Sequence, residues 1–482
     1  MDKIMENMEN NKHQGQLART MIAKTPELAG KTVRLCGWVQ IVRAHGKLIF
    51  FDLRDRSGII QAVITPKAPF FDLAKEVRTE WVVKLVGQVK ARPENMKNDK
   101  IITGGVEIAV EELQILSKAK TLPISIDGDG YEIGEDNRLK YRYLDLRRQR
   151  LQKNLVARHK VNNFLRQFLS QKDFVEIETP YISRSTPEGA RDFLVPSRLQ
   201  KGNFYALPQS PQQYKQLLMV AGFERYFQIA RCFRDEDTRG DRQPEFTQLD
   251  IEMSFADREE IMDLNEKILI ALVEELFPQK TIQEIPFPRL SYQEAMDNYG
   301  TDRPDIRNDK KNPDLLAFCW VIDFPMFEKN ENGGWTFTHN PFSAPQRQFE
   351  NDLLAGGDIE KIMSTQYDIV LNGGEIGGGS LRSHRPEVLE KVLEIIDVKN
   401  IQQNFGHMLE ALDYGAPPHG GIAWGIDRLI MILENEPSIR ETIAFPKTGD
   451  GRDLMMNAPS EIGKRQLEEL GLAIIKKEKP VK

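Results

Sequence analysis

Residues 227–255 constrain the fold most strongly, because they place charged side chains within segments that have the pattern of β-strands. Two stretches of alternating apolar and polar residues, the second covering 246–252, flank a long loop rich in Asp, Glu and Arg. A solvated hairpin tip is the plain alternative for such a loop. However, Arg234, Asp250 and Glu252 lie in or beside the strands, where a charge is costly without a partner or a ligand. The pattern therefore favours a binding site.

The length, composition and net charge of the chain limit the class of protein to which it can belong. With 482 residues the chain is long enough for about two to four domains. No run of about 18 apolar residues occurs, so we expect no transmembrane helix and no membrane partner. Residues 1–16 are polar, which predicts a frayed tail and not a signal peptide. Cys36, Cys232 and Cys319 are far apart and suit a reducing cytoplasm, and the net charge of -6 confines any nucleic-acid binding to local basic patches.

Residues 32–117 read as five strands with one short helix after the third. This order predicts a small Greek-key barrel of the OB type, a fold that binds single-stranded nucleic acid through aromatic and basic side chains. The candidates for such contacts are Arg43, Phe50, Gln61 and Arg78. The alternative is that Phe50 belongs to the core and the arginines are solvated.

Residues 118–150 form a connector that ends in a basic run. Lys and Arg dominate 138–160, and apolar residues at helical spacing then predict an amphipathic helix to about residue 171. The basic run is equally compatible with a solvated helix face and with contacts to a phosphate backbone.

Several segments of 151–482 carry further candidate site residues. A strand is closed by Pro180, and a polar loop follows in which Glu188 is central and Gly189 permits a hinge, which predicts a lid. Lys215 lies one turn into a predicted helix, where it is either a carboxylate receptor or a solvated lysine. Arg428 lies between apolar flanks and needs an anion or a structural partner.

The glycine-rich segment 373–379 follows a predicted strand and carries Glu375, with Arg382 just beyond it. It lacks the Gly-Lys-Ser/Thr ending of a P-loop, so we exclude that mode of ATP binding. The glycines are expected to let the backbone lie close under a flat ligand.

Three of these segments together resemble the three motifs of class II aminoacyl-tRNA synthetases. The strand ending at Pro180 is similar to motif 1, residues 232–236 to motif 2, and residues 421–428 to motif 3. Residues 186–191, 209–212 and 241–248 narrow the resemblance to the bacterial type of aspartyl-tRNA synthetase. The resemblance extends from about residue 32 to about residue 459 of this chain.

The resemblance implies an α+β fold with a six-stranded antiparallel catalytic sheet, an N-terminal OB barrel that reads the anticodon, and a homodimer formed through motif 1. The corresponding domains are 1–117 for the tail and barrel, 118–150 for a hinge and 151–482 for catalysis. The implied activity joins L-aspartate to ATP, forming aspartyl-adenylate, and then transfers it to the 3′ end of tRNA-Asp. Bacterial members carry an inserted domain, which here is reduced to a short connection near 286–315.

The resemblance also assigns the ATP site. Arg234 would clamp the α-phosphate, Glu236 would hold the adenine edge, and Arg428 would bind the γ-phosphate. Arg234 and Arg428 are the implied catalytic residues. Asp368 and Glu375 would hold Mg²⁺, in agreement with its preference for hard oxygen ligands. The implied ATP-binding set is completed by Asp235, Gln243, Gly425, Ile426 and Asp427.

For the amino acid, Lys215 and Arg382 would pair with the side-chain carboxylate, and asparagine would leave these cations unpaired. The α-ammonium would be placed by Gln212, Asp250 and Glu188, and His339 would close the pocket. Family members commonly show His-His-Pro-Phe where this chain has His339-Asn340-Pro341-Phe342.

The anticodon set implied for the barrel is Arg43, His45, Phe50, Gln61 and Arg78. Members that also charge tRNA-Asn often have His at the position of His45, so relaxed specificity stays open. Two further alternatives are an asparaginyl or lysyl type of the same subclass and a non-catalytic RNA-binding paralogue. Loss of Arg234, Glu375 or Arg428 would favour the paralogue, and all three are present.

Overall fold

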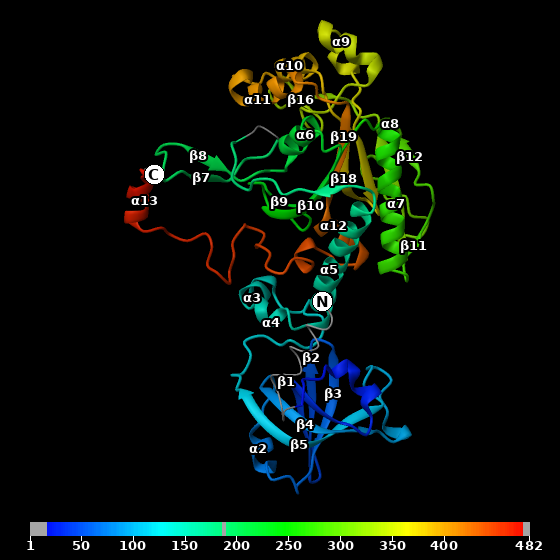
Figure 1. The fold of residues 1–482 in the computed structure, drawn as a ribbon, viewed down its shortest axis with the longest axis vertical. Coiled ribbons are helices and arrows are strands. Elements are labelled where there is room, and N and C mark those ends of the chain that lie inside the picture. Colours follow the sequence, from blue (N-terminus) through cyan, green and yellow to red (C-terminus); the bar gives the residue numbers. More distant parts are fainter. Residues whose placement is uncertain (1–16, 186–188, 476–482) are drawn as a thin grey trace, which may run out of the picture. The chain divides into compact units, whose positions relative to one another are not determined.

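The computed structural model describes residues 17–185 and 189–475, and the chain divides into two compact units, 1–123 and 124–482 (Figure 1). Each unit has a hydrophobic core of its own. The boundary lies after Pro123, whereas the sequence predicted a first domain that ends at residue 117 and a hinge over 118–150. Most of that hinge region belongs to the second unit.

The first unit is a closed barrel with the strand order β1-β2-β3-β5-β4. Alternate residues point inward, so Val33, Leu35 and Val39 of β1 are buried. The parallel pair β3 and β5 closes the barrel, and α2 connects β3 to β4, as the sequence predicted for an OB-type barrel. The elements are η1 (Ile22–Leu28), β1 (Thr32–His45), β2 (Leu48–Asp55), β3 (Gly58–Ile64), α2 (Phe71–Glu76), β4 (Val82–Ala91), η2 (Glu94–Met96) and β5 (Val106–Ser117).

The second unit is built on a sheet with the order β12-β14-β17-β18-β19-β10-β9-β6. The strands from β14 to β9 pair antiparallel, as expected. A short parallel strand extends each edge of these antiparallel strands, so the sheet has 8 strands in all. The strands are β6 (Val175–Glu176), β9 (Arg225–Phe233), β10 (Glu245–Ser254), β12 (Arg289–Ser291), β14 (Phe318–Ile322), β17 (Tyr367–Leu371), β18 (Gly374–Leu381) and β19 (His419–Gly425).

Three helices bury one face of this sheet: α5 (Gln149–Ser170), α7 (Arg258–Leu276) and α12 (Ile426–Leu433) (Figure 1). Their apolar residues form one core with the sheet, and Val161, Ile261 and Leu429 are among its fully buried members. Burying such side chains stabilises the layer by about 1.5–3 kcal/mol each. The opposite face packs a second apolar cluster at its β14–β17 end, which includes Cys319, Val321 and Val370, and carries buried polar side chains on β10.

Strand β10 shows how the sequence separates the two faces. Leu249, Ile251 and Met253 belong to the core beneath the helices. Because side chains alternate along a strand, Asp250 and Glu252 must point to the opposite face. Both carboxylates are nevertheless buried, at 1% and 0% exposure, so the opposite face must supply partners.

The region preceding α5 contains the short helices α3 (Glu135–Lys140) and α4 (Arg142–Asp145), whose arginines are buried. Arg138 lies 2.7 Å from Glu441 and 3.0 Å from Asp145, and Arg142 lies 2.8 Å from Asp145. This part of the basic run is therefore neither a solvated face nor available to a phosphate backbone. Both interpretations suggested by the sequence are wrong for these arginines.

The remaining elements of the second unit lie around the edges of the sheet or, as for β7 (Leu194–Pro196), β8 (Phe204–Ala206) and α13 (Lys464–Leu470), project to one side of it (Figure 1). The others are α6 (Gln212–Val220), β11 (Thr281–Ile282), α8 (Tyr292–Tyr299), β13 (Leu315–Leu316), β15 (Phe327–Lys329), β16 (Trp335–Phe337), η3 (Arg347–Phe349), α9 (Glu350–Ala355), η4 (Ile359–Lys361), α10 (Pro386–Ile395), α11 (Ile401–Asp413) and η5 (Ile439–Glu441).

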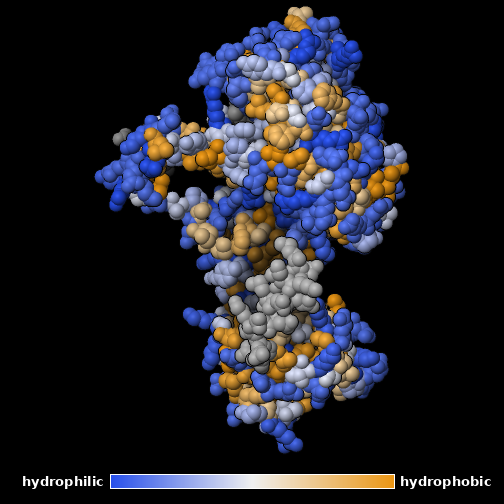
Figure 2. All heavy atoms as spheres, viewed as in Figure 1, coloured by the Kyte–Doolittle hydropathy of each residue, from blue (hydrophilic) through white to orange (hydrophobic). Residues whose placement is uncertain are grey.

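The exposed surface of the second unit is mixed in character. On the face shown in Figure 2 it presents mostly hydrophilic residues, with hydrophobic ones interspersed. Among the helices of the described residues, none combines the length and the apolar character needed to cross a membrane.

Candidate active site

Two adjoining cavities lie on the polar face of the sheet, with volumes of about 290 and 320 Å³. We call them the first and the second cavity. They share lining residues from separate parts of the chain, which join them into one continuous site. The shared residues are Arg234, Glu236, Gln248, Glu375 and Ala423.

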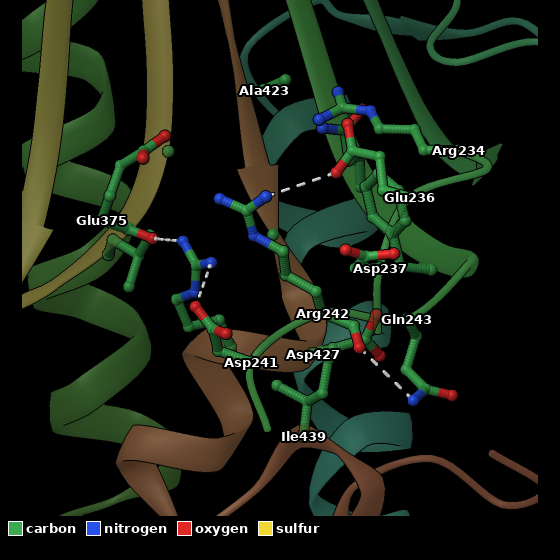
Figure 3. A pocket seen from close by; sticks show the side chains of 16 residues that line it. Arg234, Glu236, Asp237, Asp241, Arg242, Gln243, Glu375, Ala423, Asp427 and Ile439 are labelled. Atoms are coloured by element: carbon green, nitrogen blue, oxygen red, sulfur yellow. Dashed lines mark hydrogen bonds and ion pairs between the residues drawn. The ribbon is translucent and has the colours of Figure 1, made fainter. Parts of the chain in front are cut away.

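The first cavity is lined by three arginines and several acids (Figure 3). The guanidinium of Arg234 lies over the ring of Phe246, 5.1 Å from its centroid, and no acid among residues 17–185 and 189–475 forms an ion pair with it. Two other arginines face acids of the same loop: Arg242 lies 3.4 Å from Glu236, and Arg428 lies 3.3 Å from Asp241. The cavity therefore presents guanidinium groups to an anionic ligand.

The second cavity contains two buried cations, Lys215 and Arg382, which point toward two buried acids of β10. Lys215 Nζ lies 3.0 Å from Asp250 and 3.3 Å from Glu252. Arg382 donates to both oxygens of Glu252, from Nε at 2.9 Å and from Nη2 at 3.2 Å. Lys215 is only 1% exposed, so the alternative of a solvated lysine is wrong.

Electrostatic effects differ for the two acids. Burial opposes ionisation of Glu252, but Arg382 and Lys215 outweigh it and lower the pKa of Glu252 to about 2. Burial dominates at Asp250 and raises its pKa, although Lys215 acts in the opposite direction. Oδ2 of Asp250 has no hydrogen-bond partner within the described residues. Since an unpaired buried oxygen is costly, this atom is suited to a cationic ligand group.

His339 and Asn340 form one wall of the second cavity. Burial and the nearby cations lower the pKa of His339 to about 3, so the imidazole is neutral at pH 7. Oδ1 of Asn340 accepts a hydrogen bond from the backbone N–H of Phe342 at 2.9 Å. Asn340 thus shapes the turn at the place where family members commonly have a second histidine.

Asp368 and Glu375 lie close enough to influence each other. Burial and the negative charge of Glu375 raise the pKa of Asp368. Gln366 donates to both carboxylate oxygens at 3.2 Å, and no cation is paired with Asp368 within the described residues. Two hard oxygen ligands with uncompensated charge fit a divalent cation such as Mg²⁺. The described residues hold no group of three or more His, Cys, Asp or Glu side chains, so the remaining ligands would come from phosphate or water.

Most residues predicted for the site line one of the cavities. The first is lined by Arg234, Glu236, Gln243, Glu375, Gly425, Asp427 and Arg428, and the second by Gln212, Lys215, Arg234, Asp250, His339 and Arg382. Glu188 lies outside the described residues, although the following Gly189 and Ala190 line the second cavity.

Three of the predicted ATP residues have other surroundings. The side chain of Asp235 is 51% exposed, near Arg191, and it lines neither cavity. Ile426 is fully buried in the core, because it begins α12 on the side that faces the sheet. Asp427 lines the first cavity but accepts a hydrogen bond from the backbone N–H of Thr247 at 2.9 Å and pairs with Arg158, which gives it a structural role.

Two residues without a predicted role take part in the site. Glu252 joins Lys215 and Arg382, and its position two residues after Asp250 on one strand was a signal that both carboxylates share a face. Asp241 faces Arg428, which no local pattern indicates because the two residues are distant in sequence.

The candidate nucleic-acid residues of the barrel form only part of one surface. Arg43 forms two hydrogen bonds with Asp52, at 2.6 and 2.8 Å, and lies opposite Phe50 in the register of β1 and β2. Gln61 lies opposite Asp52 on β3, and Phe50 is half-buried and outside the core cluster. The alternative that Phe50 is a core residue is therefore wrong.

His45 and Arg78 lie apart from that strand surface. His45 is exposed at the end of β1, where the chain turns into β2. Arg78 donates to the backbone carbonyls of Lys75 and Val77 beside the end of α2. The guanidinium of Arg78 is thus partly occupied by local hydrogen bonds.

Each of the two units matches a known protein family. Residues 134–449 match the family model of class II tRNA synthetases (D, K and N), and residues 33–116 match that of the OB-fold nucleic acid binding domain. A protein of Dictyoglomus turgidum named aspartate--tRNA(Asp/Asn) ligase is 41% identical, over 92% of this chain and 96% of that protein. A Desulfatibacillum aliphaticivorans protein of the same name is 40% identical, over 93% of this chain and 96% of that protein.

Solved structures show the same fold. The asparaginyl-tRNA synthetase of Pyrococcus horikoshii with asparaginyl-adenylate superposes with a TM-score of 0.74 and 24% identity, over 90% of this chain and 99% of that chain. The aspartyl-tRNA synthetase of Entamoeba histolytica gives a TM-score of 0.71 and 25% identity, over 90% and 93%. The alignment to the Dictyoglomus protein spans 573 positions although this chain has 482 residues, so gaps fall in this chain. The Dictyoglomus protein therefore has residues that have no counterpart in this chain, and their place near residues 286–315 stays a prediction.

Proposed function

The chain belongs to the class II aminoacyl-tRNA synthetases of the D, K and N type, and we propose that it activates L-aspartate with ATP and transfers it to tRNA-Asp. The observation that carries this proposal is that Arg234 lines both cavities. One guanidinium then reaches a nucleotide in the first cavity and an amino acid in the second, at the place where the two must be joined.

The first step needs positioning and charge stabilisation instead of a general base. The α-carboxylate of aspartate is already a nucleophile, and one of its oxygens attacks the α-phosphorus of ATP. The P–O bond to the β-phosphate breaks, and pyrophosphate leaves. Arg234 stabilises the charge on the α-phosphate, and Arg428 holds the terminal phosphates. In the second step a ribose hydroxyl of the tRNA attacks the aspartyl carbonyl, and AMP leaves.

Magnesium fits this arrangement. Asp368 and Glu375 are the two residues that would hold it. When bound, Mg²⁺ neutralises charge on the phosphates of the nucleotide.

Selection of aspartate follows from the cations of the second cavity. Lys215 and Arg382 are buried and sit where a side-chain carboxylate would gain two charged partners. Asp250, whose Oδ2 has no partner within the described residues, is suited to the α-ammonium. An asparagine side chain would leave the cations without added negative charge, so the geometry supports aspartate over asparagine.

Amino-acid-dependent exchange of pyrophosphate into ATP tests the proposal. L-Aspartate should support exchange and L-asparagine should not. If aspartate fails, the proposed reaction is wrong, and exchange with asparagine or lysine would identify the neighbouring activity.

The tRNA specificity needs a separate measurement. The names of the relatives support charging of tRNA-Asn as well as tRNA-Asp. Purified transcripts of both tRNAs should accept aspartate at comparable kcat/KM. Charging of tRNA-Asp alone would contradict the relaxed specificity but not the activation step.

A homodimer and a cytoplasmic location are part of the proposal. After α5, the apolar residues Val175, Tyr181 and Ile182 are 45%, 43% and 54% exposed, which is suited to an interface with a second copy. Light scattering after gel filtration should give twice the mass of one chain.

The three cysteines form no disulfide, which supports a reducing compartment.

A further inference from the structure

The loop between β9 and β10 ends in a small hairpin whose tip is Gly240-Asp241. The backbone groups of Arg239 and Arg242 hydrogen-bond to each other at 3.3 and 3.2 Å and close the tip. Asp241 is therefore presented by a folded turn, although the loop is long and charged.

The tip is also fixed to the segment that follows α12. The carbonyl of Gly240 accepts hydrogen bonds from Ser438 Oγ at 2.9 Å and from the N–H of Ile439 at 3.1 Å. Ile439 itself lines the first cavity. These contacts hold the backbone next to Asp241 at the cavity wall, while its side chain, which is 42% exposed, is free to rotate about its own bonds.

The carboxylate of Asp241 faces the cation that the proposed reaction needs for the terminal phosphates. Asp241 Oδ2 lies 3.3 Å from Arg428 Nη2, while Nη1 of the same guanidinium donates to the carbonyl of Glu375. In Figure 3 the dashed lines from Asp241 and Glu375 end on this side chain, which has no label. The side chains of Arg428 and Asp241 are 22% and 42% exposed, so the pair is in contact with solvent and can separate.

We propose that Asp241 acts as a substitute for the terminal phosphates: it pairs with Arg428 while the first cavity is empty, gives way when ATP binds, and returns as pyrophosphate leaves. This inference rests on the proposed function, because it takes ATP as the ligand of Arg428. A carboxylate and a phosphate oxygen compete for the same guanidinium hydrogens, so the two cannot occupy Nη2 in the same geometry.

A second ion pair of the same loop supports this role. Arg242 lies 3.4 Å from Glu236, whose carboxylate the resemblance assigns to the adenine edge. The loop thus supplies counterions to two residues that line the first cavity. The alternative is that Asp241 positions Arg428 for ATP, and the two roles predict opposite effects on affinity.

The test compares Asp241→Asn with the wild type in the full-length protein. The variant keeps the size of the side chain and removes the competing charge. Because an exposed ion pair contributes little, the Kd for ATP should fall about two- to fivefold, and the Kd for magnesium pyrophosphate should fall by a similar factor. Isothermal titration calorimetry measures both without turnover. In exchange assays the pyrophosphate concentration for half-maximal exchange should fall by a similar factor in the variant.

Asp237→Asn is the matched control, since Asp237 belongs to the same loop and lines the same cavity but forms no ion pair with Arg428 within the described residues. If the affinities for ATP and pyrophosphate change equally in both variants, the effect is one of general charge, and the inference is overturned. Weaker ATP binding by Asp241→Asn would also overturn it and would establish the positioning role. Asp241→Glu, which restores the carboxylate, should return both affinities toward the wild-type values.

The inference and the proposed function fail in distinguishable ways. If the wild type shows no aspartate-dependent exchange, the function is wrong. If exchange is normal and Asp241→Asn leaves the affinities for ATP and pyrophosphate unchanged, only the inference is wrong.

Discussion

Glu252 accepts two hydrogen bonds, at 2.9 and 3.2 Å, from Arg382, which lines the second cavity. The cation expected to bind the substrate is therefore already paired before any ligand arrives. A substrate carboxylate must join this pair instead of finding a free guanidinium. The remaining nitrogen, Nη1 of Arg382, donates to Ser380 Oγ at 2.8 Å, a hydroxyl that a carboxylate can replace.

Replacing Glu252 by Gln should destabilise the protein. The change leaves Arg382 and Lys215 buried with one acid fewer, and breaking a buried pair on one side costs about 3–5 kcal/mol. We therefore expect the free energy of unfolding to fall by about 3 kcal/mol, measured by urea denaturation, and the KM for aspartate to rise.

Glu469→Gln is the control for that measurement. Glu469 pairs with Arg465 on α13 at 3.0 Å, but the side chains are 52% and 90% exposed. The same chemical change should cost less than about 1 kcal/mol there. Equal losses in the two variants would contradict the role assigned to Glu252.

The contribution of Glu252 should disappear in acid. Its folded pKa is lowered to about 2 from an ordinary value of 4.5, so its stabilisation is complete above pH 4.5 and is lost as the pH falls toward 2. Within this window the difference in unfolding free energy between the wild type and Glu252→Gln should shrink by about 1.4 kcal/mol per pH unit. Urea denaturation at pH 5.5, 4.5 and 3.5 measures it, and a constant difference would refute the lowered pKa.

The two faces of β10 can be predicted from the sequence because they depend only on the residues within the strand. Alternation alone places Leu249 and Ile251 on one face and Asp250 and Glu252 on the other, and both placements are found in the structure. The costs of buried charge then indicate a site, since a carboxylate within a strand needs a partner.

The basic run before α5 shows where local patterns fail. Arg138 is buried because it pairs with Glu441, which lies 303 residues later in the sequence. In the same way Arg150, at the start of α5, pairs with Glu436. Nothing near Arg138 in the sequence signals these partners. A solvated helix, a phosphate contact and a buried ion pair all use the same residue types, so only the tertiary structure separates them.

Phe50 and Phe51 of the barrel should separate RNA binding from stability. Phe51 is fully buried in the barrel core, whereas Phe50 lies outside it beside Arg43. Phe50→Ala should weaken tRNA binding by about 1–3 kcal/mol, through the loss of a stacking surface, with little change in unfolding. Phe51→Ala should instead destabilise the barrel by about 3–5 kcal/mol. Filter binding and thermal unfolding measure the two effects, and normal tRNA binding by Phe50→Ala would exclude it from the RNA surface.

Glu375→Gln should change the dependence on magnesium. Losing one of two proposed carboxylate ligands should raise the Mg²⁺ concentration for half-maximal exchange by at least about tenfold, and chelation should abolish exchange in the wild type. Glu390→Gln, an exposed change on α10, serves as the control and should leave the titration unchanged. An unaltered magnesium titration in Glu375→Gln would remove this residue from the metal site.

Arg234→Ala should abolish aspartate-dependent exchange while the protein stays folded. Arg234 faces both cavities and lies over the ring of Phe246, and no described acid forms an ion pair with it, so its removal leaves no described carboxylate unpaired. The loss of one donor to a developing charge costs about 10²–10³ in kcat. Arg234→Lys keeps the charge but lacks the planar fork, so it should recover only part of the rate. Arg225→Ala, at the other end of β9, makes the same change away from the cavities and should exchange normally. Near-normal exchange by a folded Arg234→Ala variant would show that the reaction does not pass between the two cavities.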